Sequence, residues 1–164
     1  MTLLNNPILK PYIGKPAVLD SNLLLFKWCA DFAPSLVTNF KRLNSFQFED
    51  IDVLSETLKV FSVLRTTPHV LTEVSNLANQ LPTWVKGDWS LYFSRQIQLI
   101  SEEWIPASTI AADDSIWLGL TDASLTYLAQ THVILTLDFP LSNSLASRGL
   151  NVINFTHLRS MWLE

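Results

Sequence analysis

The sequence predicts an α/β fold of three layers, α/β/α, in which helices flank a central parallel sheet. Short apolar runs that suit buried strands alternate with longer segments whose apolar residues repeat at helical spacing. Residues 133–137 form the clearest predicted strand, because they are mostly β-branched and apolar. Residues 50–65 form the clearest amphipathic helix. Strands separated by helices make βα units, and such units build a parallel sheet.

Prolines and glycines divide the first half of the chain into segments. Pro34 and Pro82 each follow an apolar segment and end it. The predicted elements are an N-terminal arm (1–15), a strand (17–19), a buried helix (22–32), the amphipathic helix (50–65), a strand (69–71), and helices at 72–81 and 84–101.

The second half repeats this alternation. Thr121 is a plausible N-cap for a helix, and Gly149 suits the position that closes one. The predicted elements are a loop or connection (106–115), a short helix (115–120), a helix (121–130), the strand at 133–137, a short helix (140–148) and a last strand (151–155).

Length and composition indicate one globular domain over residues 1–164. The chain has 164 residues, of which 48% are hydrophobic and 16% charged, which is too apolar for disorder. No apolar run approaches the roughly 18 to 20 residues of a membrane span, and we see no signal peptide, so we expect a cytoplasmic protein without a membrane partner. Cys29 is the only cysteine, which excludes an internal disulfide and predicts a buried thiol.

The net charge argues against a simple basic nucleic-acid-binding surface. It is −4 at pH 7. A nuclease remains compatible with this charge, because clustered carboxylates raise the negative count and bound metal cations offset them locally.

Acidic residues recur at the predicted ends of strands and starts of helices. Asp20 and Asp138 each follow a predicted strand, Asp122 opens a helix, and Glu73 begins another. Each acid alone has an ordinary explanation as a helix cap, a turn residue or a favourable charge near a helix dipole. Ligands of open α/β sheets bind beyond the carboxyl ends of the strands, so these acids can converge there although they are distant in sequence.

Converging carboxylates favour a hard divalent cation. Like charges raise one another's pKa, and a bound metal reverses that effect. Oxygen ligands without a cysteine or histidine set favour Mg²⁺ or Mn²⁺ over zinc. Such a site suits hydrolysis of phosphodiester bonds.

Five segments resemble, in order, the conserved motifs of PIN domains. An apolar strand leads into Asp20, a helix presents Glu73, and Asp138 follows a strand that carries Thr136. The matching segments are 17–22, 67–74, 118–124, 135–139 and 151–155. Together they span most of the chain.

The resemblance implies a metal-dependent ribonuclease of the VapC-like toxin type. The residues that match the metal-site acids are Asp20, Glu73, Asp122 and Asp138, and those that match supporting polar residues are Asn22, Thr121 and Thr136. The implied cofactor is Mg²⁺ or Mn²⁺, and the implied substrate is RNA. Relatives of this type commonly have an antitoxin that covers the active-site groove, and homodimers are common. The apolar faces at 23–26 and 61–64 are candidates for lining such a groove, although core packing is the expected role of both.

The sequence also departs from the pattern. It has extra residues at 32–50 and 84–106, and few basic residues near the motifs. Lys15, Lys27, Arg65 and Arg148 are candidates for phosphate contacts, with solvated surface as their expected role.

Two rival interpretations follow. The first is a catalytically weak PIN-like module that binds RNA or protein without cutting. The second is a flavodoxin-like or response-regulator-like domain, which the lack of a glycine-rich loop and of any lysine after Lys86 disfavours.

Overall fold

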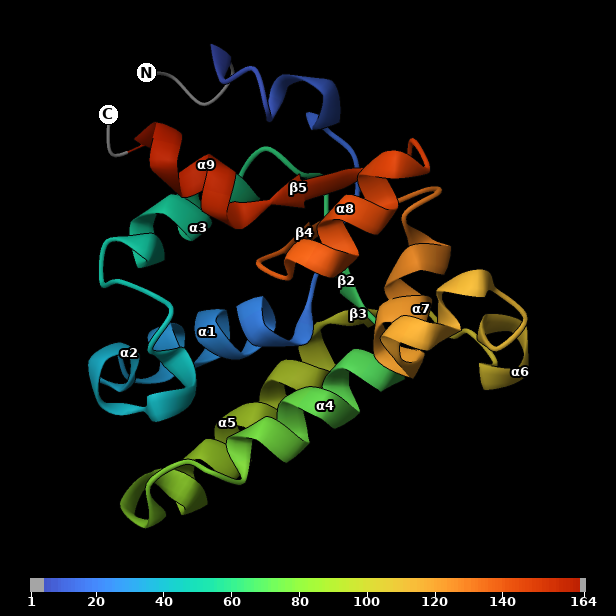
Figure 1. Cartoon of the computed structure of the whole chain (residues 1–164). Helices are drawn as coiled ribbons and strands as arrows, with labels where there is room; N and C mark the ends of the chain where they lie inside the picture. Colours follow the sequence, from blue (N-terminus) through green and yellow to red (C-terminus); the bar gives the residue numbers. More distant parts are fainter. Residues whose placement is uncertain (1–4, 163–164) are drawn as a thin grey trace.

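A parallel sheet of five strands forms the centre of the computed structural model, which describes residues 5–162 (Figure 1). The spatial order of the strands is β3-β2-β1-β4-β5, and every neighbouring pair is parallel. The strands are β1 (Ala17–Leu19), β2 (Leu64–Thr66), β3 (Ser101–Glu102), β4 (Val133–Thr136) and β5 (Val152–Asn154).

Helices flank this sheet and complete the predicted three-layer α/β/α fold. The α-helices are α1 (Ser21–Phe32), α2 (Leu36–Asn39), α3 (Asp50–Leu58), α4 (Pro68–Ala78), α5 (Lys86–Leu99), α6 (Ala107–Ile110), α7 (Leu120–Leu128), α8 (Phe139–Ser147) and α9 (Phe155–Trp162). Short 3₁₀ turns lie at η2 (Lys10–Tyr12), η3 (Lys41–Leu43), η4 (Thr83–Val85) and η5 (Asp114–Leu118). Figure 1 shows α4 and α5 in the lower part of the picture, below α1, and α8 above α1.

The two central strands are buried along their whole length. In β1, Val18 pairs with Arg65 of β2 on one side and with Ile134 of β4 on the other. All residues of β1 and β4 are buried, which explains why both read as continuous apolar runs.

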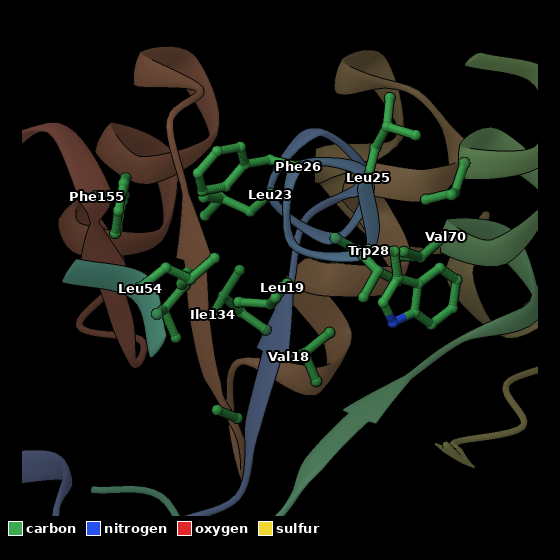
Figure 2. Packing of buried hydrophobic residues seen from close by; sticks show 14 of the residues in the cluster. Val18, Leu19, Leu23, Leu25, Phe26, Trp28, Leu54, Val70, Ile134 and Phe155 are labelled. Carbon is green, nitrogen blue, oxygen red and sulfur yellow. The ribbon is translucent and has the colours of Figure 1, made fainter. Parts of the chain in front are cut away.

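The hydrophobic core joins the sheet to α1 and α3. Figure 2 shows side chains of α1, among them Leu23 and Phe26, gathered near Ile134 of the sheet and Leu54 of α3. Phe26 stacks on Phe46 with ring centroids 4.1 Å apart. The apolar run at 23–26 is therefore core, as expected.

The amphipathic helix predicted at 50–65 is too long. The helix α3 ends at Leu58, and Leu64–Thr66 forms β2. Apolar residues at 61 and 64 continue the helical spacing by coincidence, because they pack on the core from a turn and a strand. The strand β2 was not predicted because Arg65 lies at its centre. A charged residue in a three-residue strand breaks the apolar run by which a buried strand is predicted.

The strand predicted at 69–71 is wrong. These residues lie in the first turns of α4, which begins at Pro68. Thr67 caps this helix, since its Oγ1 accepts a hydrogen bond from the backbone N–H of Val70 at 3.1 Å. A proline is favourable at the first position of a helix, so Pro68 marks the start of α4 and not a break in the chain. Glu73 consequently lies in the second turn of the helix and not in the first.

Several other boundaries move by a few residues. Gly119, with φ 106°, is the N-cap of α7, so Thr121 is not the cap. Asp138 caps α8, which begins at Phe139. Gly149 follows α8 with φ 67°, which confirms its predicted role in closing that helix. The edge strand β3 and the last helix α9 were not predicted.

The N-terminal arm packs on the domain. Met1–Leu4 of the predicted arm lie outside the described residues. Leu9 is fully buried, and the N–H of Gly14 donates to the carbonyl of Val60 at 2.8 Å. Cys29 is buried as predicted, and burial raises the pKa of its thiol to about 12. Among residues 5–162, no helix combines the length and the apolar character that crossing a lipid bilayer requires.

Candidate functional site

The candidate site lies where the strand order reverses. From β1 the chain adds β2 and β3 on one side of the sheet, then returns to place β4 and β5 on the other. The carboxyl ends of β1 and β4 therefore form a topological switch point, where open α/β sheets bind ligands. Asp20 directly follows β1, and two residues after β4 comes the next acid, Asp138.

Asp20 is held firmly at this point. Its Oδ1 accepts a hydrogen bond from the N–H of Leu23 at 2.7 Å, which makes it the N-cap of α1. Its Oδ2 accepts from the hydroxyl of Thr136 and from the N–H of Leu137 at 3.2 Å. Burial raises the pKa of Asp20 to about 6, although these hydrogen bonds act in the opposite direction.

Thr136 connects two of the acids. Its hydroxyl donates to Asp20, and its Oγ1 accepts from the N–H of Asp138 at 2.9 Å. Asp138 in turn caps α8 by accepting from the N–H of Leu141 at 2.7 Å. Its side chain is exposed, so one oxygen remains open to solvent at the switch point. Thr136 thus has the supporting position that the sequence predicted.

Asp122 and Glu73 are the other two acids of the predicted site. Asp122 lies half-buried in the first turn of α7, and Glu73 lies half-buried on α4. Burial first, and then the negative charges of Asp138, Glu73 and Asp20, raise the pKa of Asp122 to about 7. The other three predicted acids therefore all act on the carboxyl group of Asp122. As the side chains stand, no three His, Cys, Asp or Glu residues within 5–162 are grouped closely enough to hold a metal ion.

Hydroxyl groups that the sequence did not single out hold α4 to α7. Thr67 Oγ1 and Ser124 Oγ lie 3.4 Å apart, and Ser124 donates to the carbonyl of Thr121 at 2.6 Å. Thr67 and Ser124 are both fully buried. This contact joins the start of α4 to α7, the two helices that carry Glu73 and Asp122.

A groove of about 380 Å³ runs between α4 and α7 beside the acids. Its lining residues are Pro68, His69, Thr72, Glu73, Asn76, Leu120 and Thr121. Asn22 is exposed in the first turn of α1, and Thr121 is half-buried. Neither of these two side chains makes a hydrogen bond within the described part of the chain.

The candidate cations are occupied by partners within the chain. Lys27 pairs with Asp31 at 2.6 Å, and Arg65 pairs with Glu103. Arg148 donates to both carboxylate oxygens of Asp113, each at 3.1 Å. Lys15 donates to the side-chain oxygen of Asn151 at 3.3 Å. These four residues have structural partners, as their expected surface role implies.

The strand order also separates this fold from two nucleotide-binding classes. Flavodoxin-like and response-regulator-like domains have the order 2-1-3-4-5, whereas this sheet has 3-2-1-4-5. Dinucleotide-binding sheets share the observed order but place a glycine-rich turn after the first strand. Here Asp20 stands at that turn and caps α1, so its carboxylate would repel a pyrophosphate.

Comparison with protein-family models, with curated proteins and with solved structures gave no significant match. The geometry of the switch point is therefore the basis for assigning a function. The switch point offers carboxylate oxygens as possible metal ligands at the N-termini of three helices, α1, α7 and α8.

Proposed function

We propose that this chain is a metal-dependent endoribonuclease that hydrolyses RNA phosphodiester bonds. One observation carries the proposal: three acids from separate segments, Asp20, Glu73 and Asp138, act on the carboxyl group of a fourth, Asp122, beside the switch point of a parallel sheet. The order of these acids along the chain matches the PIN-domain pattern to which the sequence is similar.

The donor set fits Mg²⁺ or Mn²⁺. Asp20, Glu73, Asp122 and Asp138 offer only carboxylate oxygens, which hard cations prefer. Burial and the negative charges of neighbouring acids raise the pKa of Asp20 and Asp122, and a bound divalent cation would favour their ionised forms. When bound, such an ion lowers the pKa of a water and neutralises charge on the phosphate.

The remaining residues of the site would position the substrate. Thr136 fixes the orientation of Asp20 through its hydroxyl. Asn22 and Thr121 carry polar groups that are not used inside the described chain, so they are suited to bind phosphate or ribose oxygens. The N-termini of α1, α7 and α8 add positive dipole ends that favour an anionic substrate.

Cleavage of total RNA by the purified protein tests the proposal. We expect cutting with Mn²⁺ or Mg²⁺, none with EDTA, and a loss of at least about 100-fold in Asp122→Asn. Asp88→Asn is the matched control, because Asp88 is an exposed acid in the first turn of α5, outside the site. Equal cutting by wild type and Asp122→Asn would reject the site.

The proposal extends to a toxin that is held inactive by an antitoxin. Large apolar side chains are exposed on the described surface, and three of them are Trp104 (78%), Trp117 (73%) and Phe139 (65%). Aromatic residues are enriched at protein–protein interfaces, so these side chains are candidates for contact with a partner. Phe139 directly follows Asp138, so a partner that covers this ring would also block the site.

Growth after induced expression tests the toxin role. We expect wild type to arrest growth, Asp122→Asn to permit it, and the product of the neighbouring small open reading frame to restore it. Equal growth with wild type and Asp122→Asn would contradict a toxin. Light scattering on the purified protein determines whether the chain also forms the homodimer that is common among such relatives.

A second candidate is a PIN-like module that binds RNA or protein without cutting. The same exposed tryptophans support it, because aromatic side chains are frequent at binding surfaces. Metal-independent retention of RNA by a folded protein that never cuts would favour this module over the nuclease.

A further inference from the structure

We propose that Thr67 and Ser124 are positioning residues of the proposed metal site, because their buried hydroxyls join the helix of Glu73 to the helix of Asp122. This inference rests on the proposed nuclease function and names residues that act on the cation only through the two acids. Residues of this kind do not touch the metal, but they decide how well its ligands converge on it.

The hydroxyls form a directed chain of three hydrogen bonds from α4 to α7. The N–H of Val70 donates to Thr67 Oγ1 at 3.1 Å, and Ser124 Oγ donates to the carbonyl of Thr121 at 2.6 Å. Ser124 has a single hydroxyl proton, and the bond to Thr121 uses it. Thr67 is therefore the donor in the 3.4 Å contact between the two side-chain oxygens. Both hydroxyls are fully buried, and each has a partner, as buried polar groups require.

The first turn of α7 lacks the support that the other helices of the site have. Asp20, Thr67 and Asp138 each cap a helix through a side-chain oxygen. The N-cap of α7 is Gly119, which has φ 106° and no side chain to accept a hydrogen bond. Glycine restricts the backbone least of all residues, so it does not fix the direction in which α7 starts. The hydroxyl chain from α4 ends on this first turn and supplies the missing constraint.

The two helices also carry like charges. The negative charge of Glu73 is one of the causes that raise the pKa of Asp122. Without a cation this repulsion acts to separate α4 from α7, and the buried hydroxyl chain opposes it. Glu73 can turn toward a cation by rotating its side chain, whereas the spacing of the helix backbones has to come from the packing between them. Ser124 lies only two residues after Asp122, so it constrains the backbone that carries this acid.

Mn²⁺ binding measured without RNA tests this role. Electron paramagnetic resonance of free Mn²⁺ gives the affinity of the purified protein, and the part that Asp122→Asn removes belongs to the site. Ser124→Ala deletes the central hydroxyl and should weaken that affinity about 10-fold. Thr67→Ser keeps a hydroxyl at each position, so it should bind Mn²⁺ like the wild type.

Thr57→Val is the matched control for lost stability. Thr57 is fully buried, and its Oγ1 donates to the carbonyl of Val53 at 2.6 Å within α3, which carries none of the four site acids. Both Thr57→Val and Ser124→Ala should lower the melting temperature, and only Ser124→Ala should weaken Mn²⁺ binding. Equal weakening in the two variants would overturn the inference, because general destabilisation would then be the cause.

Cleavage of RNA over a range of Mn²⁺ concentrations gives a second readout. Ser124→Ala should need about 10-fold more Mn²⁺ for half-maximal cutting and should approach the wild-type rate at saturation, whereas Asp122→Asn should not recover. Unchanged Mn²⁺ affinity in Ser124→Ala would overturn the positioning role and leave the nuclease intact. A folded wild type that binds no Mn²⁺ would overturn both the metal site and the inference.

Discussion

The hydroxyl of Thr136 donates to Oδ2 of Asp20 across 116 positions of sequence. This bond joins the carboxyl ends of the neighbouring strands β1 and β4. Thr136 also accepts from the N–H of Asp138, so one hydroxyl orders two of the proposed metal ligands. Both Thr136 and Asp20 are buried, which makes the bond important for folding as well as for the site.

Replacing Thr136 by valine should destabilise the protein. The two side chains have nearly the same shape, but valine removes one of the donors to the buried carboxylate of Asp20 and the acceptor of the Asp138 N–H. We expect a loss of about 2 kcal/mol in the free energy of unfolding, measured by urea denaturation. The pKa of Asp20 should also rise further, because the Thr136 bond lowers it.

Thr136→Ser is the control for this substitution. Serine keeps the hydroxyl and loses only a methyl group, so it should retain most of the stability and the pKa of Asp20. If valine and serine destabilise the protein equally, lost packing and not the hydrogen bond is the cause.

Asp122→Asn should make the metal-free protein more stable while it removes activity. The carboxyl group of Asp122 is costly to ionise because of burial and three neighbouring acids. A neutral amide of equal size removes that cost, and we expect a gain of about 1 kcal/mol near neutral pH after solvent screening. Thermal melts in EDTA measure the gain, with Asp88→Asn as the comparison. Lower stability of Asp122→Asn would show that Asp122 has a structural role.

The metal-free protein should become less stable as the pH rises from 3.8 to about 7. The pKa values of Asp20 and Asp122 are raised from 3.8 to about 6 and about 7 in the folded state. Between the unfolded pKa of 3.8 and these folded pKa values, the folded protein binds more protons than the unfolded chain. A rise in pH over this interval therefore favours unfolding. The stability that these groups contribute is complete below the unfolded value and is lost as the pH passes 6 to 7.

Melting curves at stepped pH in EDTA and in Mn²⁺ measure this slope. Mn²⁺ should reduce the slope, because a bound cation favours the ionised acids. Asp122→Asn should reduce it without metal. A metal-free stability that rises over the same interval would contradict the burial of these acids.

A second ionic group lies away from the acids and gives an independent prediction. Glu103 Oε1 accepts from Arg65 and lies 3.4 Å from Nε2 of His132. Burial lowers the pKa of His132, while the negative charge of Glu103 opposes that shift. Glu103→Gln should therefore lower the pKa of His132 further, as NMR titration of its ring would detect. The neighbouring exposed acid provides the control Glu102→Gln, which should leave the titration unchanged.

The sequence was sufficient to predict the fold class and the ends of two strands. The strands β1 and β4 are apolar on both faces because helices cover the sheet, and such runs are visible without a structure. Asp20 directly follows β1 and Asp138 lies two residues after β4, so their convergence could be predicted from parallel topology alone. The structure supports their placement, while the metal and the nuclease activity remain predictions.

The strands β2 and β3 could not be predicted in the same way. β2 contains Arg65 and β3 consists of Ser101–Glu102, so neither has an apolar run. Their strand conformation comes from pairing with a neighbour, β2 with β1 and β3 with β2. Contacts between distant segments, such as Thr67 with Ser124, likewise leave no local pattern in the sequence.

The central position of β4 has a consequence for the synthesis of the protein. Asp20 is made early, but the residues that hold its Oδ2 are Thr136 and Leu137, and β1 stays unpaired on one side until β4 is present. A nascent chain that ends before this strand lacks both those donors and Asp138. At about 5–20 residues per second, the ribosome must complete most of the described chain before the acids can assemble. The proposed nuclease therefore cannot become competent while its first half alone emerges next to ribosomal RNA.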